Sequence, residues 1–250
     1  MSDFDRGLPR AVPAGAADMA VDAGLRGFML GVYNKVALGL VWSAVLAYVT
    51  SSVPAVRDLL FHVDATGRFA GITLLGMLVG WSPLVILLVS GFAMRNPTAQ
   101  SSGILYWVIV SLIGASLGMW VLIYTGASIA VTFLITASAF GALSLFGYAT
   151  KRDLTGIGSL LIVALWGIII ASLVNIFIHS PAVSFAVNIL GVVIFAGLIA
   201  YDTQRLKMTY YAVGGDSRAA GVASSYGALS LYLDFINLFL FILRLTGGRR

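Results

Sequence analysis

Residues 189–206 read ILGVVIFAGLIAYDTQRL, and residues 227–245 read GALSLYLDFINLFLFILRL. Each stretch is close to the length of about 20 mainly apolar residues that crosses a bilayer. Each also contains one aspartate, Asp202 or Asp234, and these are the only two of the ten acidic residues that lie inside a long apolar segment. Because a charged group costs roughly 2.5–3.5 kcal/mol at the centre of a membrane helix, such residues usually face the bundle interior and have a function.

The composition of the whole chain is that of a membrane protein. Its 250 residues are 60% hydrophobic and 10% charged, whereas a soluble domain is about 45–50% apolar and about 25% charged. The formal net charge is +5, but no basic run interleaved with aromatic residues accompanies it, so nucleic acid is not an expected partner. The chain has no cysteine, which excludes disulfides and thiolate metal sites. The expected partner is the lipid bilayer.

Seven apolar windows have the length of a membrane-spanning helix. They are roughly 28–50, 72–94, 103–124, 127–149, 157–178, 183–206 and 227–246. We therefore predict an all-α polytopic membrane protein whose seven-helix membrane domain occupies residues 25–250. Residues 1–24 are predicted to form a flexible cytoplasmic tail, because they lack a helical period and the basic start of a signal peptide. A polar loop is expected over residues 207–226.

The distribution of Lys and Arg predicts a cytoplasmic N-terminus. With that orientation nine basic residues lie on the cytoplasmic side, and Lys35 can extend to the same side as a tenth. The opposite side holds five, which are Arg57, Arg68, Arg244, Arg249 and Arg250. Three of these five belong to the C-terminus. The charge balance therefore indicates that the last segment is re-entrant, or short and buried among the others.

The predicted topology places the two aspartates at similar depth. Asp202 lies about 3–4 residues from the inner end of its helix and Asp234 about seven residues into the next one, roughly 5–6 Å and 10 Å. Consecutive helices are antiparallel, so the carboxyls can meet. In a low-dielectric site two carboxylates cannot both ionise cheaply, and we expect them to share one proton and titrate as a coupled pair. The simpler interpretation is that each aspartate only hydrogen-bonds a neighbouring helix.

Such a pair has two possible uses. A shared proton would hold the two helices together as a pH-sensitive latch. When ionised, the same carboxyls form a cluster of hard oxygen ligands of the kind that Ca²⁺ prefers.

Other polar residues are candidates for weaker roles. Arg95 closes the second window, in SGFAMRNPT (90–98), and is a candidate counter-charge for the pair, although anchoring at lipid headgroups is the simpler role. Several polar residues within the windows could line a polar interior or form hydrogen bonds between helices. They are Asn34, Lys35, Asn175, Asn188 and Asn237. Gly114 and Gly118 have the spacing of a helix-packing motif.

Enzymatic functions find little support in the sequence. The only histidines, His62 and His179, lie in predicted outer loops and lack the spacing of a zinc-binding HExxH motif. No nucleophile elbow or nucleotide-binding loop is expected, because no strand is predicted. An intramembrane aspartyl protease also needs two carboxylates, in a YD and a GxGD motif. Tyr201 fits the first motif, but Leu233 stands where the second requires glycine. We predict that the protein is not an enzyme and has no resident cofactor.

Taken together, the two aspartate motifs resemble the Bax inhibitor-1 family, in its bacterial membrane-protein branch. The stretches that carry the resemblance are AYDTQRLK (200–207), SLYLDFINLFLFILRL (230–245), TFLITASAFGALSLFGYATKRDLTGIGSLL (132–161) and VYNKVALGLVWSAV (32–45). The resemblance extends over nearly everything after residue 25. It implies a seven-helix bundle in the cell inner membrane whose last helix is enclosed by the other six.

The resemblance also implies two functional hypotheses. In the first, the protein is a pH-sensitive calcium leak channel gated by an aspartate pair that matches Asp202 and Asp234, which bind Ca²⁺ transiently as the transported ion. An arginine that matches Arg95 is a candidate partner of this pair. In the second, the protein is a non-conducting regulator of a membrane-anchored AAA protease or another quality-control partner, a role with which some bacterial relatives are linked.

Overall fold

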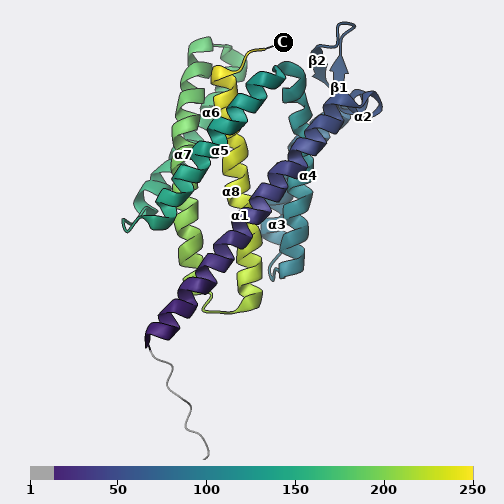
Figure 1. The fold of residues 1–250 in the computed structure, drawn as a ribbon. Coiled ribbons are helices and arrows are strands. Elements are labelled where there is room, and N and C mark those ends of the chain that lie inside the picture. The colour runs from purple at the N-terminus through teal and green to yellow at the C-terminus, as the bar shows by residue number, and fades with distance from the viewer. Residues whose placement is uncertain (1–13, 250) are drawn as a thin grey trace, which may run out of the picture.

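Seven long helices form a bundle in the computed structural model, which describes the backbone of residues 14–249 and the side chains of residues 23–249 (Figure 1). They are α1 (Ala14–Ser52), α3 (Leu74–Ala93), α4 (Ala99–Ile123), α5 (Gly126–Ala149), α6 (Thr155–Ile178), α7 (Pro181–Ala212) and α8 (Ser217–Thr246). Each contains a window long and apolar enough to cross a membrane. The structure therefore confirms the predicted all-α polytopic fold with seven spans.

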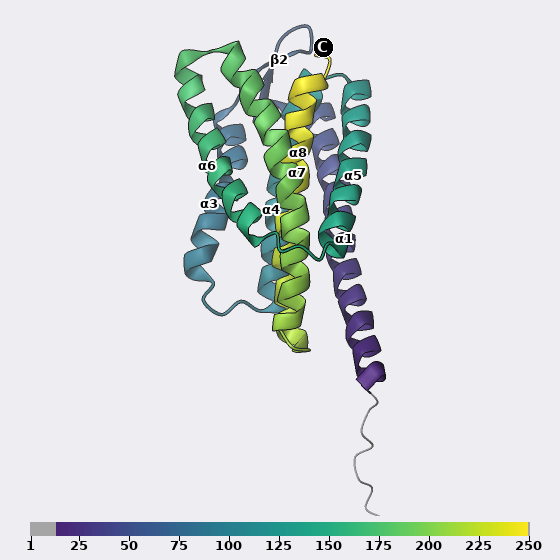
Figure 2. The ribbon, with the colours of Figure 1, turned by 90° about the vertical axis from the view of Figure 1, so that its left-hand side faces the viewer.

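The bundle has two ends, which we name after the chain termini (Figures 1 and 2). The amino end carries the start of α1 and the turns at 94–98, 150–154 and 213–216. The carboxyl end carries the turns at 124–125 and 179–180 and the last described residues of the chain. Consecutive spans are therefore antiparallel, as short connections require.

The connection between α1 and α3 contains the two strands of the described chain. A short helix, α2 (Pro54–Leu60), leads into an antiparallel hairpin of β1 (Phe61–Val63) and β2 (Phe69–Ile72). Asp64 closes its turn, because its Oδ1 accepts hydrogen bonds from the backbone N–H groups of Thr66 and Arg68 at 2.9 Å each. The prediction of a chain without strands is wrong here. The hairpin packs on the end of α4, where Phe61 shares a buried cluster with Leu122.

The connection between α7 and α8 is much shorter than the loop predicted over 207–226. The helices leave only residues 213–216 between them. Gly214 and Gly215 turn the chain with φ of 58° and 85°, a left-handed conformation that favours glycine. Asp216 then caps α8, because its Oδ1 accepts hydrogen bonds from the N–H groups of Arg218 and Ala219. The loop prediction is wrong because low hydropathy does not mark the ends of these helices, which continue beyond their apolar parts.

The division into a tail and a membrane domain stays a prediction. Residues 1–13 of the predicted tail lie outside the described residues. Helix α1 begins at Ala14, so the backbone of residues 14–24 is helical and extends from the amino end of the bundle (Figure 1).

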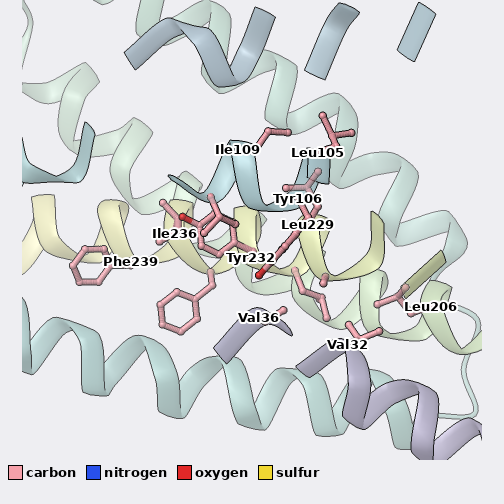
Figure 3. Packing of buried hydrophobic residues seen from close by; sticks show 14 of the residues in the cluster. Val32, Val36, Leu105, Tyr106, Ile109, Leu206, Leu229, Tyr232, Ile236 and Phe239 are labelled. Carbon is pink, nitrogen blue, oxygen red and sulfur yellow. The ribbon is translucent and has the colours of Figure 1, made fainter. Parts of the chain in front are cut away.

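Helix α8 is the most deeply buried span. In its most apolar window 61% of the residues are buried, compared with 6–33% in the other spans. It packs mainly against α1, α4, α5 and α7. Figure 3 shows Tyr232 and Phe239 of α8 among side chains that include Val36 of α1 and Ile109 of α4. Enclosure of α8 by all six other spans stays an expectation from the resemblance.

The last span is a single continuous helix from the amino end to the carboxyl end. Beyond its last turn, the N–H of Thr125 donates to the carbonyl of Gly248 at 3.1 Å, which fixes the end of the chain to the α4–α5 turn. The last segment is therefore neither re-entrant nor short, whereas the expectation that it is buried among the other helices is confirmed. The charge count ignored the aromatic rings against which Arg244 and Arg249 are packed.

Close packing of α1 on α4 generates a first prediction. A Cβ atom added to Gly114 of α4 would lie 2.7 Å from the Cα of Ser43 in α1, whereas one added to Gly103 of the same helix would meet nothing within 4 Å. We expect Gly114→Ala to lower the free energy of unfolding by about 1–3 kcal/mol, because it overpacks the interface. Gly103→Ala should leave it unchanged or raise it by up to about 1 kcal/mol, because alanine is the better helix former. Thermal unfolding in detergent measures both, and equal melting temperatures would contradict the prediction.

Candidate functional site

The structure brings the two predicted aspartates together between α7 and α8. Asp202 comes from α7 and Asp234 from near the middle of α8, and each is only 6% exposed. Their carboxyls are close enough for the charges of the ionised forms to repel each other. Because a proton on one carboxyl removes this repulsion and supplies a hydrogen-bond donor, the arrangement is suited to a single shared proton.

The two carboxyls have unlike surroundings. The hydroxyl of Ser230 in α8 donates to Oδ2 of Asp202 at 2.6 Å. On the other side, Nη2 of Arg205 in α7 lies 3.4 Å from Oδ1 of Asp202. The Oδ2 atom of Asp234 is buried and receives no hydrogen bond from the described residues. Asp202 therefore has a hydroxyl and a guanidinium beside it, whereas the described residues supply no donor to Oδ2 of Asp234.

Arg205, rather than Arg95, is the arginine beside the pair. Arg95 is exposed in the turn between α3 and α4, and within the described chain it forms no ion pair. Sequence analysis missed both Arg205 and Ser230. Each lies three or four residues from one of the aspartates, a spacing that places side chains on the same helix face. That spacing could have identified them.

A cavity of about 410 Å³ lies at the amino end of the bundle, and Arg205 is part of its lining. Its lining includes four basic residues, which are Lys151, Arg152, Arg205 and Lys207, and one acidic residue, Asp153. Hydrogen bonds from Thr155 hold the pKa of the Asp153 carboxyl below its usual range. Because Arg205 lines the cavity and also contacts Asp202, it is the direct link between the pair and the solvent-facing surface.

A second polar cluster lies between α1, α4 and α8. The Nζ atom of Lys35 is 3.1 Å from the hydroxyls of both Ser224 and Ser225 in α8. The hydroxyl of Tyr106 in α4 donates to the backbone carbonyl of Lys35 at 2.6 Å. Lys35 thus forms hydrogen bonds between helices, and its ammonium is held by serine side chains.

The predicted asparagines have different surroundings. Asn175 links α6 to the start of α7, because its amide donates to Ser184 at 2.7 Å and accepts from the N–H of Ser180 at 3.0 Å. Asn237 donates to a carbonyl of its own helix, and Asn34 is exposed. None of these three forms a hydrogen bond with Asp202 or Asp234 in the described chain.

The aspartate pair offers few ligands for a metal ion. The described residues contain no group of three or more His, Cys, Asp or Glu side chains that could hold a metal ion. Ca²⁺ takes six to eight oxygen ligands, and the pair with Ser230 offers fewer. A cation at this position would keep part of its hydration shell.

Comparison with known proteins extends the similarity over the whole membrane domain. Residues 25–250 match the family described as "Inhibitor of apoptosis-promoting Bax1". A protein from Caulobacter vibrioides is 65% identical over 250 residues, which is 100% of both chains. RP147 of Rickettsia prowazekii is 46% identical over 92% of each chain. The inner membrane protein YbhL of Escherichia coli K12 is 43% identical over 91% of this chain and 94% of its own.

The contact between Ser230 and Asp202 generates a second prediction. Ser230→Ala should lower the free energy of unfolding by about 1–3 kcal/mol at neutral pH, because it leaves a buried carboxylate oxygen without its donor. Thermal unfolding in detergent at neutral pH measures this.

The matched control for this prediction is Ser138→Ala. That hydroxyl is exposed and donates only to the carbonyl of Leu134 in its own helix. If both substitutions lower the free energy of unfolding by the same amount at neutral pH, the hydrogen bond from Ser230 to Asp202 stabilises the protein no more than an exposed hydroxyl does.

Proposed function

The chain belongs to the Bax inhibitor-1 family, and we propose that it conducts a pH-sensitive calcium leak across the cell inner membrane. The observation that carries the proposal is the pair of buried carboxyls, Asp202 and Asp234, on consecutive spans. Carboxyls inside a membrane bundle usually mark an ion or proton pathway. That the chain is a multi-pass membrane protein of this family does not depend on the proposal.

In the proposed closed state the pair carries one proton. Asp234 donates it to ionised Asp202, whose charge is stabilised by Ser230 and Arg205. Loss of this proton leaves two carboxylates side by side. At a separation of about 4 Å and an effective dielectric constant of about 20, they repel by about 4 kcal/mol. A hydrogen bond between membrane helices contributes only about 0.6–2 kcal/mol, so the repulsion is large enough to separate α7 from α8 locally.

The same step that opens the latch creates the cation site. Two ionised carboxylates attract a divalent cation, whose charge removes their mutual repulsion. Calcium fits this role because its coordination is flexible and it accepts carboxylate, hydroxyl and water oxygens together. In the proposed mechanism, Ca²⁺ binds transiently between Asp202 and Asp234 while it passes.

We place the amino end in the cytoplasm. Among the described residues this end carries Arg26, Arg95, Lys151, Arg152, Arg205, Lys207 and Arg218, whereas the carboxyl end carries Arg57, Arg68, Arg244 and Arg249. An excess of basic residues marks the cytoplasmic side. Because the basic cavity beside Arg205 opens at the amino end, the latch would respond to cytoplasmic pH.

Calcium flux into liposomes tests the channel. For the wild-type protein we expect flux to rise as the pH rises through the loss of the shared proton. Asp234→Asn should keep flux low and nearly independent of pH, because its amide still donates to Asp202 and cannot ionise. Asp202→Asn should also remove the pH dependence, because it ends the coupling of the two carboxyls.

The matched control is Asp216→Asn, which exchanges an aspartate at the same end of the bundle. Asp216 caps α8, and asparagine serves equally well in that position. Its flux profile should equal that of the wild type. Equal leak by the wild type and both pair variants at every pH would reject the latch.

The alternative function, regulation of a membrane-anchored AAA protease or another quality-control partner, is favoured by one observation. Helix α1 extends beyond the other spans at the amino end (Figure 1). In that position it offers a partner a surface without any conduction through the bundle.

Deletion of residues 1–24 separates the two functions. For a regulator, deletion should abolish co-purification of the protease, and Asp234→Asn should have no effect on it. For a channel, deletion should leave calcium flux intact, and Asp234→Asn should remove its pH dependence. Flux no greater than that of empty liposomes, together with a co-purifying protease, would favour the regulator.

A further inference from the structure

A polar cavity of about 290 Å³ lies between α6, α7 and α8 near the carboxyl end of the bundle. Figure 2 shows the arrangement of these three helices. Its polar lining consists of Ser172, Asn175, Ser184, Asn188, Arg244 and Arg249, and Val187 is its apolar residue. By contrast, the cavity between α1 and α5 is lined almost entirely by apolar side chains. The polar cavity is therefore the one of these two that is suited to a charged ligand.

The cavity contains two guanidinium groups and no acidic side chain. Arg244 belongs to the last turn of α8, and Arg249 follows that helix. Within residues 23–249 neither arginine forms an ion pair. The side-chain amide of Asn188 forms no hydrogen bond with the described residues. The polar groups available in the cavity are therefore predominantly hydrogen-bond donors with positive charge.

Aromatic rings fix both guanidiniums without neutralising them. The Cζ atom of Arg244 lies 4.9 Å from the ring centre of Trp120 and 5.6 Å from that of Phe241. The Cζ atom of Arg249 lies 5.9 Å from the ring centre of Tyr124. A cation–π contact positions a guanidinium by its face, so the N–H donors at its edge stay available to a ligand.

The backbone that carries Arg249 is also fixed. The N–H of Gly248 donates to the hydroxyl of Ser128 at 2.9 Å, and its carbonyl accepts from the N–H of Thr125 at 3.1 Å. The second guanidinium is therefore held beside the cavity by the α4–α5 turn. A site with donors that are positioned in advance loses little conformational freedom on binding.

Two simpler explanations leave part of the arrangement unexplained. The partial negative charge at the end of α8 favours one cation there, Arg244. It does not account for a second guanidinium and a free amide in the same cavity. The positive-inside rule gives no reason for these arginines either, because the carboxyl end is the end with fewer basic residues.

We propose that this cavity binds a phosphate-type oxyanion. Arginine presents N–H donors in a planar fork that matches phosphate oxygens in a bidentate manner. The volume is slightly smaller than the roughly 300–1,000 Å³ of sites for drug-sized molecules, so it suits a single small anion or a headgroup. The phosphate can come from an anionic lipid of the same membrane leaflet or from free phosphate in solution.

The test uses the full-length protein purified in detergent without phosphate. Native mass spectrometry after exposure to phosphatidylglycerol measures retained lipid, and isothermal titration with inorganic phosphate measures the free anion. We expect one of the two to bind to the wild type. Arg249→Gln should weaken that binding about tenfold or more, as expected for loss of a charge-assisted hydrogen bond. Arg249 follows α8, so this substitution leaves the packing of the helix unchanged.

Two further variants sharpen the result. Arg244→Lys keeps the charge but loses the planar fork, and it should weaken binding, because a bidentate site distinguishes the two side chains. Arg57→Gln is the matched control, because Arg57 lies at the same end but is paired with Asp58 outside the cavity. Its binding should equal that of the wild type.

Retained phosphatidylglycerol would identify the lipid as the source, and bound inorganic phosphate would identify a soluble anion. No binding of either probe by the wild type would overturn the proposal. Equal binding by the wild type and Arg249→Gln would overturn it as well. None of these readouts depends on calcium flux, so failure here is distinguishable from failure of the proposed channel.

Discussion

Two carboxyl groups share one buried contact between α7 and α8, and the electrostatics of that contact constrain the rest of the site. A lone ionised aspartate would be costly in this interior, and two would repel each other strongly. The hydroxyl of Ser230 and the guanidinium of Arg205 lie beside the Asp202 carboxyl. Oδ2 of Asp234 receives no hydrogen bond from the described residues, so a proton on that carboxyl would remove the cost of a buried charge. In the mechanism that we propose, the stability of this interface between two spans depends on a single titrating proton.

Hydropathy predicted the number and order of the spans because hydrocarbon allows few alternatives to a helix. The same signal could not place the ends of α7 and α8. Those ends are set by local backbone chemistry, with two left-handed glycines and the cap at Asp216. The hairpin was missed for a related reason. Its strands are only three and four residues long, and they depend on packing against α4, which no local pattern reveals.

The candidate site was predictable in part. Two carboxylates in apolar sequence are conspicuous, and the antiparallel order of their helices predicted that they could meet. The sequence pattern indicated Arg95, at the end of a different helix, as the counter-charge, so it did not predict the groups beside the pair. The structure instead uses Arg205, one turn from Asp202 on the same helix. Similarly, the number of Lys and Arg residues on each side of the membrane predicted a re-entrant or short last segment, whereas α8 is one long helix. Such a count does not consider the aromatic rings against which Arg244 is packed.

Helix α8 connects the two sites. Asp234 and Arg244 are ten residues apart on this continuous helix, roughly 15 Å along its axis. A displacement of α8 that follows loss of the shared proton would therefore also move Arg244 relative to Asn188 on α7. If an anion at the carboxyl end binds one position of α8 more tightly, it must bias the proton at the pair by the same free energy, because coupling between two binding equilibria is reciprocal. A buried helix with a titrating group in its middle and a ligand at its end is sufficient for that coupling, and no contact between the two sites is required.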